Sequence, residues 1–233
     1  MSRLLKPAAF ALSGALAALI FCCLLVAGMA DDAARVRADA YSQGYEDAKE
    51  DSQPLFDRPI PEGNHMPLWL QTDPQWDYIP YANGTIGDSG CGLVAAAMAI
   101  KYMTLQEVTP LQLADSVGDS CLTDGVNDPG KFCEWIATRY PEYNIERSQI
   151  SYDLDGALAA VEDGWLCFAG MSGDFGDSSY GGHVVLIWRA DDDGYWVRDP
   201  DSAGNSARSF TADELAAVDF KYFYTIRGGF YGA

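Results

Sequence analysis

The stretch CGLVAAAMAIKYM, residues 91–103, constrains the fold of this chain more than any other. Its pattern predicts a helix that is apolar on nearly every side, with Lys101 as its single charged residue. A helix of this kind is stable only when it is buried, so the rest of the domain has to be built around it. Its first residue, Cys91, stands between two glycines and raises a question of function as well as of packing.

The remaining pattern changes from helices to strands along the chain. Thr109 and Pro110 form a helix start, and Thr211 with Glu214 has the spacing of a capping box. Further helices are expected at residues 109–118, 128–140 and 153–164. Strands are expected at residues 165–171, 183–190, 195–200 and 220–226. Helices followed by a mostly antiparallel sheet predict an α+β fold, with the helical part packed on the sheet.

The N-terminal thirty residues differ from the rest. Arg3 and Lys6 precede an apolar run that ends at Ala30, and two aspartates follow directly. This charge asymmetry places the N-terminus in the cytoplasm and everything downstream outside it. Residues 1–30 are therefore a signal peptide or an N-terminal membrane anchor, and both alternatives stay open. The protein is expected to be extracytoplasmic, either secreted or anchored to the membrane.

Two further segments follow. Residues 31–67 are polar and then proline-rich, which predicts a stalk or linker, and His65 in that linker is interpreted as a surface residue. Residues 68–233 form the predicted folded domain. Fifteen Lys and Arg residues against 34 Asp and Glu give a net charge of −19, which argues against nucleic acid or anionic membrane surfaces as partners. The spacing of cysteines and histidines shows no zinc signature, so neither a metal nor a cofactor is expected.

Cys91 has two interpretations. Cysteine is most often a small buried hydrophobe, so a structural role comes first. The first turn of a helix also carries the positive end of the macrodipole and unpaired N–H groups, which favour a thiolate nucleophile and an oxyanion beside it. Asp88 or Ser89 is placed to cap this helix start.

The chain has two histidines, and His183 is the candidate general base. It follows the glycine-rich segment SGDFGDSSYGG, residues 172–182, which is expected to be a flexible loop with His183 at the mouth of the next strand. The turn DDDG at residues 191–194 predicts a hairpin that returns Asp199 to the side of His183. Asp199 would then orient the imidazole, giving the order Cys, His, Asp of a thiol hydrolase.

The stretches WLQTDPQWDYIP, SGCGLVAAAMAIKYM, GGHVVLI and YWVRDPDS resemble the bacterial cysteine peptidases of family 39, in its "like" branch, between about residues 69 and 201. That family contains the bacteriocin-processing peptidases. The resemblance implies a papain-like fold with Cys91 as nucleophile, His183 as base and Asp199 as orienting residue. A glutamine completes the oxyanion hole in such enzymes, and Gln71 is the candidate, although it lies twenty residues upstream of Cys91. No transporter portion is present, so leader processing coupled to export is not expected.

Cys121 and Cys133 are expected to form a disulfide outside the membrane, whereas Cys167 is read as a core residue. The predicted function is an extracytoplasmic cysteine peptidase that acts on a peptide, a protein or a cell-wall peptide through an acyl-enzyme. Two alternatives remain open. One is a peptidoglycan peptide hydrolase, and the other is an inactive module that binds a peptide or the cell wall in a groove lined by Trp69, Trp76, Tyr78 and Tyr81.

Overall fold

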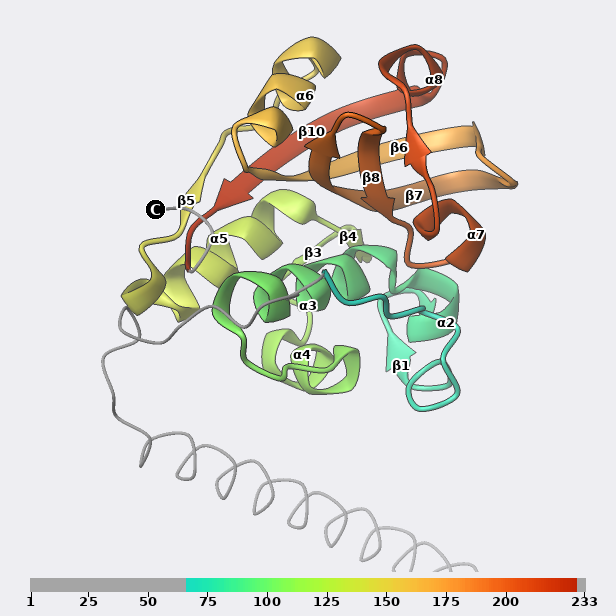
Figure 1. Cartoon of the computed structure of the whole chain (residues 1–233). Helices are drawn as coiled ribbons and strands as arrows, with labels where there is room; N and C mark the ends of the chain where they lie inside the picture. The colour runs from blue at the N-terminus through green and yellow to red at the C-terminus, as the bar shows by residue number, and fades with distance from the viewer. Residues whose placement is uncertain (1–65, 230–233) are drawn as a thin grey trace, which may run out of the picture. The chain divides into compact units, whose positions relative to one another are not determined.

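The computed structural model describes residues 66–229 (Figure 1). The predicted export segment, His65 and nearly all of the predicted linker lie outside these residues. Met66 and Pro67, assigned to the linker by sequence, already belong to the folded part. The side chain of Met66 is buried, and Arg198 donates hydrogen bonds to the carbonyls of both residues. Within residues 66–229, every helix is too short or too polar to traverse a bilayer.

The helices and strands predicted from the sequence occur in the predicted order, and the structure adds further short elements between them. The helices are α2 (Ile86–Ser89), α3 (Cys91–Thr104), α4 (Pro110–Val117), α5 (Pro129–Arg139), α6 (Leu154–Glu162), α7 (Ala203–Ser206) and α8 (Ala212–Ala216), with a 3₁₀ turn, η2, at Pro141–Tyr143. The short strands are β1 (Pro80–Tyr81), β2 (Gly84–Thr85), β3 (Leu122–Thr123), β4 (Val126–Asn127), β5 (Glu146–Arg147) and β9 (Ser209–Phe210). The long strands are β6 (Leu166–Phe175), β7 (Ser178–Asp191), β8 (Gly194–Arg198) and β10 (Asp219–Arg227).

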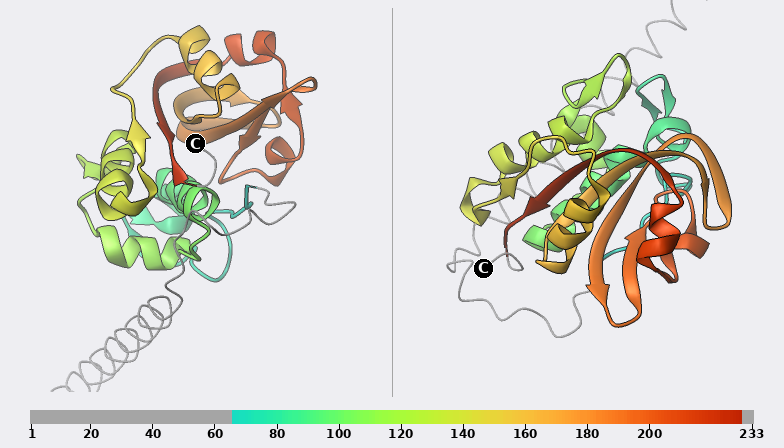
Figure 2. Two further views of the ribbon diagram at one scale, coloured as in Figure 1. Left: turned by 60° about the vertical axis from the view of Figure 1, so that its left-hand side comes forward. Right: turned by 90° about the horizontal axis from the view of Figure 1, so that it is seen from above.

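The sheet has six strands in the order β5-β10-β6-β7-β8-β9, and every neighbouring pair is antiparallel. Figures 1 and 2 show α3, α4 and α5 on one side of this sheet and α6 on the other. Residues 183–188 of β7 are all buried, because both faces of the sheet are covered at this point. The chain therefore has the predicted α+β architecture.

Helix α3 is the most deeply buried element. Every residue from Gly92 to Ile100 is buried, as its apolar sequence requires. A capping box at Thr109 with Pro110 in the first turn starts α4, and Thr211 with Glu214 starts α8 in the same way. The sequence therefore locates these helix starts correctly, because a capping motif is a local signal.

The glycine-rich segment at residues 172–182 is not a flexible loop, contrary to the sequence prediction. It forms the end of β6 and the beginning of β7, which pair from Gly173 with Tyr180 to Phe175 with Ser178 around a tight turn. Gly176 supplies the positive φ of 57° that this turn requires. His183 consequently lies within a long strand and not at its mouth.

The predicted disulfide between Cys121 and Cys133 is not formed, and both residues are free cysteines. Cys121 precedes the β3–β4 hairpin, whereas Cys133 is fully buried on α5. Cys133 lies close enough to the strand residue Cys167 to influence its ionisation. It therefore serves as a core residue between α5 and the sheet.

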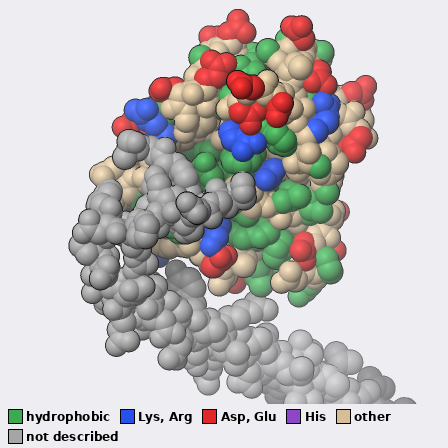
Figure 3. Space-filling view, viewed as in Figure 1, with side chains coloured by type: hydrophobic (Ala, Val, Ile, Leu, Met, Phe, Trp, Pro, Cys, Tyr) green, Lys and Arg blue, Asp and Glu red, His purple; other side chains and the backbone are tan. Residues whose placement is uncertain are grey.

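The face seen in Figure 3 shows how the large negative charge is distributed. Acidic side chains gather over the end of the domain that carries α6 and α8, and Lys and Arg side chains form no continuous patch on this face. On this face, the acidic side chains therefore lie on solvated surface.

We expect Gly90→Ala to destabilise the domain by about 1–3 kcal/mol, the range typical of overpacking. A Cβ at Gly90 would lie 2.4 Å from the carbonyl oxygen of Ile86 and 2.7 Å from its Cγ2 atom. Gly181→Ala is the matched control, since a Cβ there meets no atom within 4 Å. Urea unfolding of both variants measures the difference, and equal midpoints would contradict the packing account of the α2–α3 junction.

Candidate active site

Cys91 is the first residue of α3 and is half-buried at the edge of a pocket of about 230 Å³. The first backbone N–H groups of a helix have no partner within the helix, so they and the macrodipole favour negative charge at this point. Gly90 and Gly92 flank it, and a Cβ at either position would collide with neighbouring atoms. The two glycines therefore permit a close approach of the chain on both sides of Cys91.

The other described cysteines differ from Cys91 in their surroundings. Burial is the main cause that raises the pKa of Cys121, to about 11, and it also raises the pKa values of Cys133 and Cys167. All three are buried in the hydrophobic core, whereas Cys91 faces the pocket. Among the cysteines of residues 66–229, Cys91 is thus the one placed for chemistry with a ligand.

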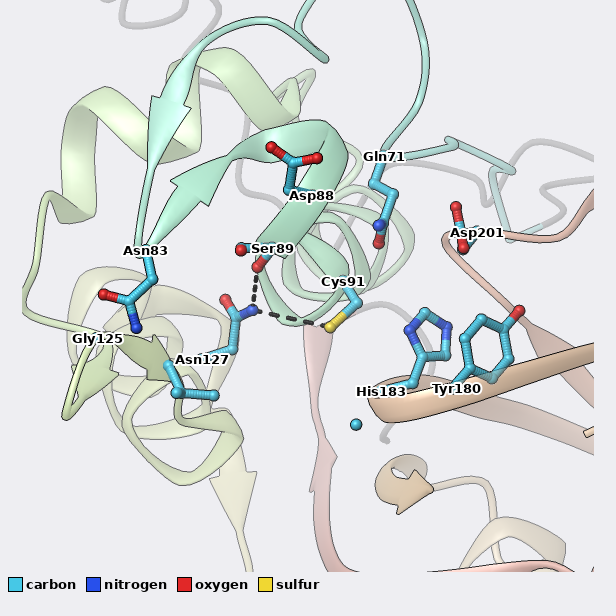
Figure 4. A pocket seen from close by; sticks show the side chains of 12 residues that line it. Gln71, Asn83, Asp88, Ser89, Cys91, Gly125, Asn127, Tyr180, His183 and Asp201 are labelled. Atoms are coloured by element: carbon cyan, nitrogen blue, oxygen red, sulfur yellow. Dashed lines mark hydrogen bonds between the residues drawn. The ribbon is translucent and has the colours of Figure 1, made fainter. Parts of the chain in front are cut away.

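His183 faces the sulfur of Cys91 from strand β7 (Figure 4). Its Nε2 atom lies 2.7 Å from Oδ1 of Asp199, which leaves Nδ1 for the thiol. Burial by itself lowers the pKa of His183, but the hydrogen bonds to Asp199 and Cys91 and the charges on both raise it to about 9. The ring is therefore held in a fixed orientation beside the sulfur of Cys91, with its protonated form favoured.

Asp199 follows β8 and is fully buried. Its Oδ1 atom accepts from His183 and from the backbone N–H of Asp201, at 2.7 and 2.9 Å. Its Oδ2 atom accepts from the hydroxyl of Tyr180 and the amide of Asn205, both at 2.9 Å. Burial alone would raise the pKa of Asp199, but the contacts with His183, Asn205 and Asp201 lower it. Four donors thus keep this carboxylate ionised without contact with water.

The hairpin explains how His183 and Asp199 meet. Strands β7 and β8 pair through the turn at residues 191–194, with Leu186 opposite Arg198. Asp199 then lies next to the segment of β7 that carries His183, as the sequence predicts from the turn alone. Asn205 links Asp199 to the end of β6, because its amide donates both to Asp199 and to the carbonyl of Phe175, the latter at 3.0 Å.

Tyr180 was not identified from the sequence. Its ring stacks on the imidazole of His183, with centroids 4.0 Å apart and planes 11° from parallel. The two residues share a face because Met171 pairs with His183 and Gly173 with Tyr180, so β7 has an additional residue at this point. The dipeptide Gly181-Gly182 is a signal of such a bulge. Tyr180 therefore holds the imidazole ring from one side and Asp199 from the edge.

Gln71 lies in the same pocket despite its distance along the chain. It is buried, and its Nε2 atom donates to the carbonyl of Gly87 at 2.7 Å. Its backbone N–H donates to the carbonyl of Pro200 at 2.6 Å, which ties it to the turn after Asp199. Its Oε1 atom is buried without a hydrogen-bond partner. One N–H of the side chain remains for a ligand.

Asn127 is a second pocket residue that was not identified from the sequence. It lies on β4 and approaches Cys91 from the side opposite His183 (Figure 4). Its Nδ2 atom lies 3.8 Å from the sulfur and also donates to the carbonyl of Ser89. The two-residue strand gives no periodic signal, so this residue could not be found from a pattern.

The charge of the pocket is acidic. Asp88 and Asp201 are the carboxylates among its lining residues, and no Lys or Arg of the described chain lines it. The complete lining is Gln71, Asn83, Asp88, Ser89, Cys91, Gly125, Val126, Asn127, Tyr180, Gly182, His183 and Asp201. Burial raises the pKa of Asp201, and the charge of Asp199 adds to that effect while His183 opposes it.

The predicted aromatic groove is not formed. Trp76 and Tyr81 are buried, and Trp69 packs edge-on against Trp76 with ring centroids 6.4 Å apart. Tyr78 is exposed, but none of these four side chains lines the pocket around Cys91. Trp69, Trp76 and Tyr81 instead pack within the segment before α3.

No protein-family model matches the sequence, and no curated protein matches it. Among solved structures, one similar chain is described as a "putative C39-like peptidase from Bacillus anthracis". It is 13% identical, with a TM-score of 0.46, and the match covers 70% of this chain and 94% of that one. At this level of similarity, the case for the site rests on its own geometry.

We expect Asp199→Asn to lower the pKa of His183 from about 9 toward its ordinary value of about 6.5. The substitution removes the charge of Asp199 that favours the imidazolium, while the contribution of Cys91 and the burial that disfavours the imidazolium both remain. An NMR titration of the imidazole nitrogens measures this change. Asp192→Asn, in the exposed turn at the far end of the hairpin, is the control and should leave the titration as in the unmodified protein.

Proposed function

We propose that this protein is a cysteine peptidase that cleaves a peptide or amide bond through an acyl-enzyme. The observation that carries the proposal is that Cys91 and His183 line one pocket, while the buried Asp199 lies 2.7 Å from the Nε2 atom of His183. A half-buried thiol at a helix start beside an oriented imidazole is the arrangement that thiol hydrolysis requires.

In the proposed reaction, the thiolate of Cys91 attacks the carbonyl carbon of the substrate. The C–S bond forms, and the carbonyl oxygen becomes an anion near the backbone N–H of Cys91. The Nδ1–H of His183 then gives its proton to the leaving nitrogen as the C–N bond breaks. Water enters, gives a proton to His183 and attacks the acyl group, which releases the acid and restores the thiolate and imidazolium.

Gln71 is proposed as the side-chain donor of the oxyanion hole. Its amide lies at the pocket beside Cys91 and has a second N–H besides the one bound to Gly87. The bond from its backbone to Pro200 couples its position to the turn that carries Asp199. This placement compensates for its distance from Cys91 in the sequence.

The proposed fold family, location and substrate follow from the sequence. The arrangement of a helix-start cysteine packed against an antiparallel sheet that carries histidine and aspartate is proposed to be papain-like, in agreement with the resemblance to family 39 peptidases. The charge asymmetry around residues 1–30 supports a location outside the cytoplasm. The substrate is then a peptide, a protein or a cell-wall peptide in that compartment.

The first test is the reaction of Cys91 with iodoacetamide as a function of pH, measured on the full chain by mass spectrometry. A free thiol ionises with a midpoint of about pH 8.5, and we expect Cys91 to be alkylated well below that pH. His183→Ala should remove this low-pH reactivity, and it should lower the hydrolysis of a diverse peptide library at least about a thousandfold. Cys91→Ala should show no hydrolysis.

Cys121→Ala is the control, because that thiol is buried outside the pocket and its removal should leave the alkylation of Cys91 intact. Slow alkylation of Cys91 that follows an ordinary thiol profile, with no hydrolysis, would contradict the proposal. That result would favour a module that binds peptides without chemistry.

Gln71→Ala separates the oxyanion hole from nucleophile activation. We expect kcat to fall by about 10²–10³-fold, since the lost donor acts on charge that develops in the transition state. The alkylation rate of Cys91 should stay unchanged, because iodoacetamide displacement forms no oxyanion. Gln75→Ala, an exposed neighbour, is the control. Equal losses in both measurements for Gln71→Ala would assign this residue a structural role.

A further inference from the structure

We infer that Asn127 is an additional residue of the active site, whose side-chain amide donates to the sulfur of Cys91 and stabilises the thiolate from the side opposite His183. The inference rests on the proposed function, because it assigns a role within the same reaction. It goes beyond the Cys-His-Asp arrangement, which has no amide on this side of the nucleophile.

The contacts of Asn127 use the whole of its amide. The Nδ2 group donates one hydrogen to the carbonyl of Ser89. Its other hydrogen is directed to the sulfur of Cys91, which lies 3.8 Å from Nδ2. The Oδ1 atom accepts from the hydroxyl of Tyr81 at 2.9 Å, in a buried contact. The sulfur therefore has a donor that is already oriented before a substrate arrives.

These partners also determine which way the amide faces. The carbonyl of Ser89 can only accept a hydrogen bond, so the NH₂ group must lie next to it. With the amide turned over, Oδ1 of Asn127 would face that carbonyl oxygen, and the hydroxyl of Tyr81 would lose its acceptor. The donor is consequently directed to the sulfur of Cys91 by two neighbours that do not themselves take part in the reaction.

The backbone around Asn127 lets its side chain lie close to the start of α3. A Cβ at Gly92 would lie 2.7 Å from Cβ of Asn127, so the glycine after the nucleophile is what lets the two segments come together. Asn127 pairs with Leu122 in the β3–β4 hairpin, and the next residue, Asp128, caps α5. The amide is thus held by a hairpin on one side and a helix start on the other.

The chemistry explains why the sulfur needs such a donor. A hydrogen bond to an ionised group is stronger than one to a neutral group, so the amide favours the thiolate over the thiol. The surrounding hydroxyls stay neutral: burial foremost, and then nearby cysteines, raise the pKa of Tyr81, while burial and the charge of Cys91 raise that of Tyr222 to about 12. An amide does not titrate, and its contribution is the same whether or not His183 has given up its proton.

The test is the pH profile of Cys91 alkylation by iodoacetamide in the full chain. We expect Asn127→Ala to raise the pH midpoint by about one unit, and hence to lower the rate about tenfold at a pH below both midpoints. Asn127→Asp keeps the size of the side chain but replaces the donor by a carboxylate, so its shift should be larger. Tyr81→Phe keeps Asn127 but removes the hydrogen bond to its Oδ1 atom. This variant should raise the midpoint less than Asn127→Ala does.

Thr123→Ala is the matched control, because Thr123 stabilises the same hairpin through Asp128, at 2.7 Å, without contacting the sulfur. An equal shift for Thr123→Ala would make the effect structural and overturn the inference. Unchanged midpoints for all Asn127 and Tyr81 variants would also overturn the inference. The proposed function would still stand in that case, provided that His183→Ala shifts the midpoint. If His183→Ala also leaves the midpoint unchanged, the proposed function fails as well.

Discussion

The buried hydrogen bond between Asp199 and His183 is the interaction on which the rest of the site depends. A carboxylate without exposure to water is strongly unfavourable unless donors surround it. Here the donors come from β7, from the turn after β8 and from α7, so the ion can be satisfied only when these segments are folded together. The same turn binds the backbone of Gln71 through Pro200. One charge thereby couples the positions of His183, Asp199 and Gln71.

Cys91 belongs to a different layer. Cys91 starts α3, which is buried among the helices on one side of the sheet, whereas His183 and Asp199 belong to the sheet and its turn. The pocket lies where these layers meet, so its geometry depends on the packing of α3 against β6 and β7 and not on a flexible loop. This explains why the apolar character of α3 matters for chemistry as well as for stability. A fully buried helix has little freedom to change the direction of its first residue.

The sequence predicts those parts of the site that leave a local signal. The all-apolar helix, the caps at Thr109 and Thr211, and the DDDG turn that returns Asp199 to His183 are all short-range patterns, and the structure agrees with them. Tyr180 and Asn127 were missed for a different reason. The first reaches the imidazole through a bulge that breaks the two-residue period of a strand, and the second lies on a two-residue strand 36 positions from Cys91. The disulfide prediction failed because loop length alone does not fix the direction in which a side chain points.

In the proposed cycle, the two sides of the sulfur have different tasks. The imidazolium of His183 stabilises the thiolate before attack, but this stabilisation ends when its proton passes to the leaving nitrogen. During hydrolysis of the acyl-enzyme the sulfur has to leave again as an anion, and the imidazolium that favours this departure forms only after His183 has accepted a proton from the attacking water. A donor that keeps its hydrogens throughout, as the amide of Asn127 does, stabilises the departing sulfur independently of the proton transfers. The acidic pocket makes such a donor more valuable, since Asp88 and Asp201 both disfavour negative charge on the sulfur and no Lys or Arg of the described residues lines the pocket to oppose them.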